Sequence, residues 1–342
     1  MDRTIKMSVN ERGITMFGKT ANKKTLIAAV LTTCLTAGAS FHIAAMESIH
    51  FLVPGGAGGG WDGTARGVGE ALSKAGLVDS ISYENMSGGG GGKAIAHLIE
   101  TAKQKHDTLM VNSTPIVIRS LSKVFPQSFR DLTPIAATVG DFGAFVVRKD
   151  SKYNSFNDVV AEFNEKPRSV KIGGGSARGS MDHLVAAMAF KASGGDARQV
   201  RYVAYDAGGK AMAGLLSGEI SILSTGFSEA LTLADSGEIR ILVMTGEERN
   251  EAAPDVPTLK ELGYDASFVN WRGFFAAPGI SDTEKTEFVT TLKKMYDTDA
   301  WENVRARNGW VELFKPDDEF VTFLEQQEKE VGALMRELGF LK

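Results

Sequence analysis

Short hydrophobic runs alternate with helical patterns along most of this chain. Between the runs, apolar residues recur at helical spacing, for example at Leu184, Val185 and Met188. This alternation predicts βαβ units with mainly parallel sheets. The runs that have the length and composition of strands are residues 49–53, 81–84, 108–111, 135–139, 144–148, 170–172, 200–204, 220–223, 239–244 and 273–276.

The C-terminal part of the chain has a different pattern. Residues 282–297, 300–308 and 317–338 predict three helices, with Asp282 and Asp317 as N-caps. About 300 residues follow the N-terminal segment, which is more than one small core needs and suits two lobes. We therefore expect an α/β protein with two lobes and a ligand cleft between them.

The first 45 residues have the pattern of an export signal. Lys19, Lys23 and Lys24 precede an apolar stretch at 25–35 that is too short to span a bilayer. Small residues predict cleavage near residue 39 or 45, with a membrane anchor as the alternative. The sequence therefore predicts a periplasmic protein.

The single cysteine, Cys34, lies within this predicted signal. Thr33 before it is larger than the residue that a lipoprotein signal carries there, so we expect no lipid anchor at Cys34. The mature protein would contain no disulfide and no thiol chemistry.

The charge balance limits the possible partners. The chain has 38 basic and 42 acidic side chains, and removal of residues 1–45 leaves 32 against 40. This acidic excess argues against nucleic acid as a partner. The five histidines form no H-E-x-x-H motif, and no carboxylates have metal-ligand spacing, so we expect neither a metal nor a cofactor.

Glycine-rich loops follow three of the predicted strands, at residues 54–63, 87–93 and 173–180. Such a loop lets backbone N–H groups approach a ligand closely, and a following helix adds its positive end, which suits an anion. In open α/β sheets, ligands bind outside the carboxyl ends of the strands. The loops therefore predict an anion-binding cleft.

Two enzymatic alternatives fit parts of the same loops. Gly58, Gly60 and Gly63 match the G-x-G-x-x-G dinucleotide fingerprint, and Glu84 ends the next strand, where a ribose-binding acid would lie. Against a nucleotide-dependent oxidoreductase, the glycines continue on both sides of the motif, and Pro54 directly follows the strand.

The second alternative is a secreted hydrolase that uses Ser176, Ser180 and His183. The G-x-S-x-G motif is missing, because Arg178 stands where its second glycine belongs. A helix-capping serine and a locally bonded histidine are the structural interpretation of the same residues.

Three further segments point to a family. They are Val53-Pro54-Gly55-Gly56 with Gly59-Gly60-Trp61-Asp62-x-Thr64-Ala65-Arg66, then Val256-Pro257-Thr258-Leu259-x-Glu261-Leu262-Gly263, and Trp271-Arg272-Gly273-Phe274. In this order they resemble the extracytoplasmic solute-binding receptors of tripartite tricarboxylate transporters, the Bug family, and its tricarboxylate-receptor branch. Asp206 and Ala204 depart from that pattern, since they replace a glycine and a proline.

The resemblance implies a fold like the type II periplasmic binding proteins. Lobe one would comprise residues 46–145 and 270–342, and lobe two residues 146–269. The protein would be a monomer that passes an organic di- or tricarboxylate, citrate-like, to membrane permease subunits without catalysing a reaction. A sensor-type carboxylate receptor is the alternative within the same fold.

The resemblance also implies which residues contact the ligand. One carboxylate would be held by the first and third loops, with Ser113 and Asp206 at the other end. For Asp62, an ordinary ion pair with Arg66 is the competing interpretation. The implied contacts are Gly56, Ala57, Gly58, Gly59, Gly60, Trp61, Asp62, Ser113, Ser176, Ala177, Arg178, Gly179, Ser180, His183 and Asp206.

Overall fold

The structure is a computed structural model that describes residues 45–342. The predicted export signal and Cys34 lie outside the described residues, so both stay predictions. Within the described part, no helix combines the length and the apolar character that a membrane crossing requires.

The first sheet has the strand order β2-β1-β3-β9-β4. β1 pairs in parallel with β2 and β3, as predicted, whereas β9 runs antiparallel to both of its neighbours, and β10 adds antiparallel to β4. The prediction of mainly parallel sheets is therefore wrong for the centre of the molecule. The strands are β1 (Met46–Val53), β2 (Val78–Asn85), β3 (Thr108–Ser113), β4 (Thr133–Arg148), β9 (Val269–Ala276) and β10 (Val311–Pro316).

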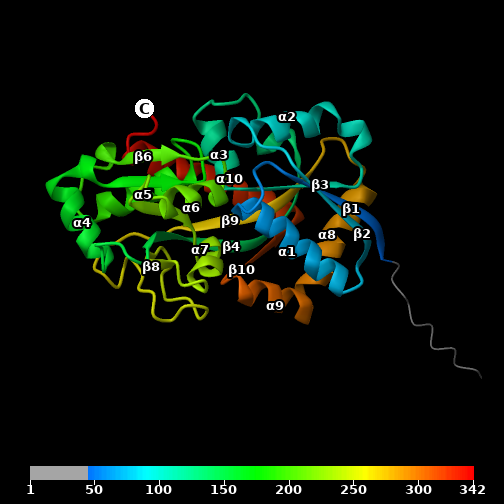
Figure 1. Cartoon of the computed structure of the whole chain (residues 1–342). Coiled ribbons are helices and arrows are strands. Elements are labelled where there is room, and N and C mark those ends of the chain that lie inside the picture. Colours follow the sequence, from blue (N-terminus) through cyan, green and yellow to red (C-terminus); the bar gives the residue numbers. More distant parts are fainter. Residues whose placement is uncertain (1–44) are drawn as a thin grey trace, which may run out of the picture. The chain divides into compact units, whose positions relative to one another are not determined.

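The second sheet continues from β4 in the order β4-β7-β5-β6, with β8 on the other edge of β4. Its parallel strands are β5 (Lys171–Gly174), β6 (Arg201–Ala204) and β7 (Ile222–Gly226), and β8 is Ile239–Met244. β4 belongs to both sheets, since it pairs with β9 up to Phe142 and with β7 and β8 from Gly143 and Ala144 onward. This shared strand joins the two lobes (Figure 1).

Two strand predictions were wrong in this central region. The predicted strands 135–139 and 144–148 are one 16-residue strand, β4, which runs on through Gly140 and Gly143. A Cβ atom at Gly140 would lie 2.6 Å from Val269 Cγ1 and 2.8 Å from Val311 Cγ2, so this glycine allows the flanking strands to close over β4. The other miss is β10, a short segment that ends in a proline and lies between predicted helices.

Helices follow most strands, as the alternation predicted. In Figure 1, α4 to α7 group with the second sheet, and α1 and α8 lie with β1 and β2. The helices are α1 (Gly60–Lys74), α2 (Gly92–Glu100), α3 (Thr114–Leu121), α4 (Phe156–Glu165), α5 (Met181–Ala192), α6 (Gly208–Leu216), α7 (Phe227–Ala234), α8 (Asp282–Tyr296), α9 (Asp299–Arg307) and α10 (Asp317–Glu337).

The predicted N-caps Asp282 and Asp317 lie one residue inside their helices. Ser281 caps α8 in a capping box: its hydroxyl accepts from the Glu284 N–H, and the Glu284 carboxylate accepts from the Ser281 N–H. Pro316 precedes α10, and Asp317 forms an ion pair with Lys285 instead.

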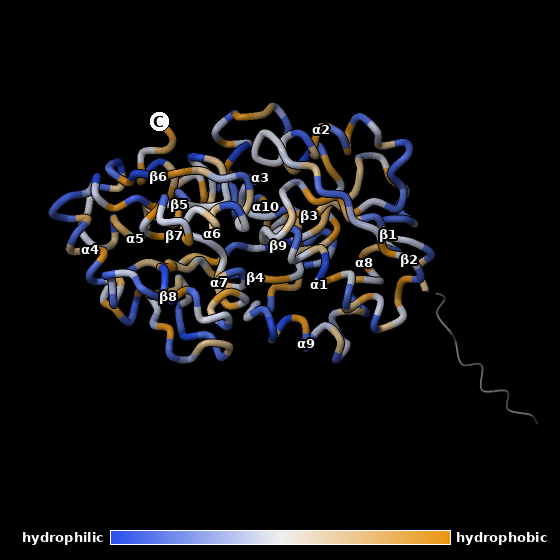
Figure 2. The backbone as a smooth tube through the Cα atoms, viewed as in Figure 1, coloured by the Kyte–Doolittle hydropathy of each residue, from blue (hydrophilic) through white to orange (hydrophobic). Residues whose placement is uncertain are grey.

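Buried aromatic side chains pack the helices onto the sheets. Trp301 and Trp310 pack with ring centroids 6.1 Å apart in the cluster that includes the buried residues of α1 and α9. Phe163 and Phe190 join α4 to α5, with centroids 4.1 Å apart. Each such side chain contributes roughly 1.5–3 kcal/mol by leaving water. Figure 2 shows hydrophobic residues along the inner elements and mostly hydrophilic outer turns.

Candidate ligand-binding site

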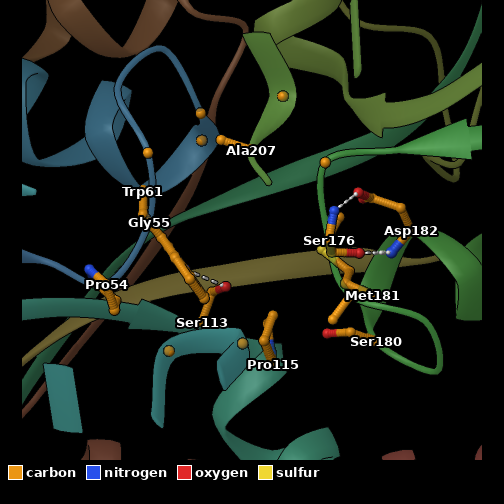
Figure 3. Close-up of a pocket in the computed structure, with 18 of the residues that line it drawn as sticks. Pro54, Gly55, Trp61, Ser113, Pro115, Ser176, Ser180, Met181, Asp182 and Ala207 are labelled. Atoms are coloured by element: carbon orange, nitrogen blue, oxygen red, sulfur yellow. Dashed lines mark hydrogen bonds between the residues drawn. The ribbon is translucent and has the colours of Figure 1, made fainter. Parts of the chain in front are cut away.

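A cavity of about 320 Å³ lies where the strands of both sheets end. The loops after β1, β2 and β3 line it from the first sheet, and the loops after β5, β6 and β7 line it from the second (Figure 3). This is the position that open α/β sheets use for ligands. The lining residues are Pro54, Gly55, Gly56, Gly59, Gly60, Trp61, Gly88, Gly89, Gly90, Gly91, Ser113, Pro115, Gly175, Ser176, Ala177, Ser180, Met181, Asp182, Ala204, Tyr205, Asp206, Ala207, Gly208, Gly226, Glu229, Asn270 and Arg272.

The structure brings most of the predicted contacts together at this cavity. Nine of them line it: Gly56, Gly59, Gly60, Trp61, Ser113, Ser176, Ala177, Ser180 and Asp206. The other six are absent from the lining and lie behind or beside it: Ala57, Gly58, Asp62, Arg178, Gly179 and His183.

Asp62 organises the first loop. Its Oδ2 accepts from the Gly58 N–H and from Arg66 Nε, both at 3.0 Å, and its Oδ1 accepts from Asn85 Nδ2 at 3.0 Å. Burial alone would raise the pKa of Asp62, but these hydrogen bonds hold it below its ordinary value. The Gly58 amide is thus already engaged, and the i,i+4 pair of Asp62 with Arg66 is present.

The third loop uses two further amides internally. Asp182 Oδ2 accepts from the Ser176 N–H at 2.9 Å, and His183 Nδ1 accepts from the Gly179 N–H at 3.1 Å. The His183 ring stacks on Tyr202 with centroids 4.7 Å apart. Burial, and then the charge of Arg178, lower the pKa of His183 to about 4. His183 is therefore a neutral side chain that fixes the loop.

Arg178 belongs to the same loop, but its side chain lies outside the cavity. Its side chain is exposed at the surface, and its Nη2 donates to the Tyr202 carbonyl oxygen at 2.6 Å. Ser180, by contrast, is only 2% exposed and lines the cavity. Its hydroxyl forms no hydrogen bond within residues 45–342, which makes it a donor for a ligand.

The first loop is tied to the end of β3. Trp61 Nε1 donates to Ser113 Oγ at 2.9 Å, so the Ser113 proton remains to be donated into the cavity (Figure 3). The second loop completes this wall with four successive glycines at residues 88–91, all of them with positive φ. Such a backbone favours glycine, and it exposes main-chain groups to the cavity.

A buried arginine lies directly behind the second loop. Arg119 on α3 is 8% exposed, and a Cβ atom at Gly90 would lie 2.9 Å from its Nε. Its Nη1 donates to the Arg178 carbonyl oxygen at 3.2 Å, and no carboxylate of the described residues forms an ion pair with it. Burial lowers the pKa of the Arg119 guanidinium.

Six helical N-termini converge on the cavity. α1, α3, α5, α6 and α7 begin at its lining residues, and the 3-10 turn at Gly89–Gly91 leads into α2. The first amides of a helix have no acceptor within the helix, and they carry its positive dipole end. The arrangement therefore favours an anionic group.

A buried ion pair that the sequence alone did not reveal lies at the base of the cavity. Arg272 on β9 is 2% exposed and donates to the Gly60 carbonyl oxygen, to Thr64 Oγ1 at 2.8 Å and to Asp141 Oδ2. Asp141 also accepts from Ser228 Oγ at 2.8 Å. The pair thereby connects α1, the central strands and the start of α7. Arg272 directly precedes the predicted strand 273–276, and this lone charge beside an apolar run is the sequence feature that could have indicated the pair.

Two acidic residues on helices beside the second sheet were also missed. Asp182 lies in the first turn of α5, and Glu229 lies in the first turn of α7; both line the cavity. Burial, and then the nearby charge of Glu229, raise the pKa of Asp182 to about 7. Burial also raises the pKa of Glu229.

Comparison with known proteins identifies the family. The family model described as the tripartite tricarboxylate transporter family receptor, TctC, matches residues 64–340. The chain belongs to this receptor family. The receptor is 25% identical to protein BugT of Bordetella pertussis over 330 residues, which cover 93% of this chain and 98% of BugT.

Solved structures agree with the two-lobed fold of the receptor. MatC of Rhodopseudomonas palustris, solved with bound malate, matches with a TM-score of 0.74 at 18% identity, over 84% of this chain and 98% of MatC. A second R. palustris protein, solved with adipate, matches with a TM-score of 0.76 at 20% identity, over 86% and 97%. The family and its structural neighbours are periplasmic solute-binding receptors, so neither enzymatic alternative holds.

Proposed function

We propose that the receptor captures an organic di- or tricarboxylate in this cavity and delivers it to the membrane permease subunits of a tripartite tricarboxylate transporter. The observation that carries the proposal is the convergence of six helical N-termini on one cavity of about 320 Å³. A cavity of this size suits a small molecule.

The donors for one carboxylate would be main-chain amides and hydroxyls. Those at Gly58, Ser176 and Gly179 are engaged within the protein, which leaves the first-turn amides of α1 and α6 and the hydroxyls of Ser113 and Ser180. Such donors recognise a carboxylate without a direct lysine or arginine contact. The structural neighbours solved with malate and adipate support this ligand class.

The remaining parts of the proposal concern the cell and the assembly. The chain would be exported by its N-terminal signal, stay unlipidated at Cys34 and act as a monomer. Residues 46–145 with 270–342, and residues 146–269, would form the lobes that close on the ligand. Closure would present a joint surface to the permease subunits.

Thermal unfolding with a ligand panel tests the proposal. The purified protein is melted with succinate, malate, adipate, citrate, NAD and sulfate. A true ligand at a hundredfold excess over its Kd stabilises the folded state by about 2.7 kcal/mol. Stabilisation by carboxylates but not by sulfate or NAD supports the proposal, and stabilisation by NAD alone contradicts it.

A further inference from the structure

The loop between β6 and α6, residues 205–207, has a strained backbone at Ala207. Ala207 has a φ of 90° and a ψ of 158°, a conformation that is almost confined to glycine because an L side chain is crowded there. Strain of this kind persists only where the surrounding structure holds it, and it is common at ligand clamps and switch regions. The strain therefore marks Ala207 as a candidate for a functional role.

The second sheet and its loops hold Ala207 in this conformation. The Ala207 N–H donates to the Gly175 carbonyl oxygen at 3.1 Å, and the Ala207 carbonyl oxygen accepts from the Ala211 N–H at 3.2 Å. A Cβ atom at Gly175 would collide with the Gly208 nitrogen, so the third loop packs backbone against backbone on this segment. The conformation of Ala207 is thus fixed without a contribution from the first sheet.

The Ala207 methyl group lies against the first loop, which belongs to the other sheet. A Cβ atom at Gly56 would lie 3.0 Å from Ala207 Cβ, and one at Gly59 would lie 3.5 Å from it. Figure 3 shows Ala207 beside the first loop. Within residues 45–342, no hydrogen bond joins residues 54–63 to residues 205–209. The two loops therefore meet through one methyl group that packs on two glycines.

We infer that Ala207 is the closure stop of the receptor: the first loop closes onto its methyl group, which sets how closely the two sheets approach over the cavity. The inference rests on the proposed function, in which the lobes close on a ligand, and it specifies the contact that defines the closed position. Glycine at position 207 would be unstrained, but it would leave a gap between the loops. A second methyl group in the same gap would hold the loops apart.

Moving the methyl group from one loop to the other tests the inference. Gly56→Ala would place two methyl groups 3.0 Å apart, so we expect roughly tenfold weaker binding in calorimetric titrations with malate, adipate and citrate. Adding Ala207→Gly to this variant should restore most of the lost affinity. The rescue is specific, because the next neighbours of a Cβ atom at Gly56 are the Asp206 carbonyl oxygen at 3.5 Å and Ser87 Oγ at 3.7 Å.

Ala207→Gly alone distinguishes a closure contact from a residue that only supports the fold. It should weaken binding roughly fourfold, the contribution of one buried methyl group, and raise the melting temperature of the ligand-free protein, because glycine adopts this φ without strain. Lys123→Gly is the matched control, since Lys123 is exposed, has a φ of 54° and does not line the cavity. It should raise the melting temperature and leave the Kd unchanged.

A pair of cysteines tests the contact without relying on a ligand. In a chain with Cys34→Ser, Gly59→Cys and Ala207→Cys would place two Cβ atoms 3.5 Å apart, which suits a disulfide. We expect mild oxidation to consume both thiols in a thiol titration. Gly63→Cys with Ala207→Cys is the control and should keep its thiols, because a Cβ atom at Gly63 has no neighbour within 4 Å.

The outcomes separate the two proposals. If carboxylates bind but Gly56→Ala has no effect, if Ala207→Gly fails to rescue it, or if Ala207→Gly lowers affinity and melting temperature together, the inference is wrong while the proposed function stands. If no carboxylate binds the unsubstituted protein, the proposed function fails. Disulfide formation then still supports Ala207 as the contact on which the first loop closes, and free thiols overturn it.

Discussion

Arg119 donates from Nη1 to the carbonyl oxygen of Arg178 at 3.2 Å and thereby joins α3 to the loop before α5. Arg119 is also the buried cation behind the second glycine loop. We expect Arg119→Gln to weaken binding of a stabilising carboxylate roughly tenfold, because both the bond and the positive field are lost. Calorimetric titration measures the change.

The control for this substitution is Arg130→Gln, which removes an exposed arginine that pairs with Glu328. It should leave the Kd unchanged. Equal affinity of the Arg119→Gln variant and the unsubstituted protein would show that Arg119 has no part in binding.

The hydrogen bond between Trp61 and Ser113 ties the first loop to β3. We expect a double-mutant cycle of Trp61→Phe and Ser113→Ala to give a coupling free energy of about 0.5–1.5 kcal/mol, the net worth of one such bond. Urea unfolding measures each variant. A coupling near zero would mean that the bond contributes nothing to holding the loop.

The buried pair of Arg272 with Asp141 predicts a strongly asymmetric mutational response. Arg272→Met leaves Asp141 buried without its counter-charge and should lower the free energy of unfolding by about 3–5 kcal/mol. The double variant Arg272→Met with Asp141→Asn should be more stable than Arg272→Met alone. Denaturant titration decides, and a double variant that is less stable than Arg272→Met would refute this account.

The raised pKa of Asp182 makes the free energy of unfolding depend on pH. Because its pKa is raised from 3.8 to about 7, the folded state holds a proton that the unfolded state has lost. The stabilising contribution of Asp182 is therefore fully present below pH 4 and is lost as the pH rises through 7. Asp182→Asn should flatten the decline in unfolding free energy between pH 4 and 7 in urea titrations. If the unfolding free energy of the variant declines as steeply with pH as that of the unsubstituted protein, the pKa of Asp182 is not raised by folding.

The lowered pKa of His183 gives the free energy of unfolding the opposite dependence on pH. Its pKa is lowered from 6.5 to about 4, so the neutral ring stabilises the folded state above pH 6.5, and that contribution is lost as the pH falls through 4. His183→Gln should reduce acid destabilisation between pH 6.5 and 4, as followed by melting temperature. A variant that loses stability in acid as steeply as the unsubstituted protein would contradict the assignment.

Much of the fold could be predicted from the sequence because its units are local. A hydrophobic run, a glycine loop and a helical pattern recur in adjacent segments, and these units place 9 of the 15 predicted contacts on the cavity wall. The single long strand β4 could not be predicted, because Gly140 interrupts the pattern locally. A glycine is needed at position 140 because Val269 and Val311, which are distant in the sequence, pack closely against it.

Some site residues were missed for the same reason, namely that their role depends on segments distant in the sequence. Arg272, Asp182 and Glu229 are ordinary charged residues beside apolar segments, and their significance depends on burial and on partners from other elements. Arg178 and His183 were predicted as contacts through the family resemblance, which includes the segment 175–183. Spacing alone does not distinguish a side chain that faces a cavity from one that supports the loop behind it.

The four glycines at residues 88–91 limit how this receptor could acquire a new ligand. All four adopt positive φ, so an L-amino acid at any of them would be strained, and this wall cannot readily gain a side chain. Changes of specificity during divergence would therefore have to arise on the facing wall, at positions such as 182, 206 and 229. One wall of the pocket is peptide backbone that substitution cannot readily change, and the facing wall carries the side chains through which substitution can alter ligand preference.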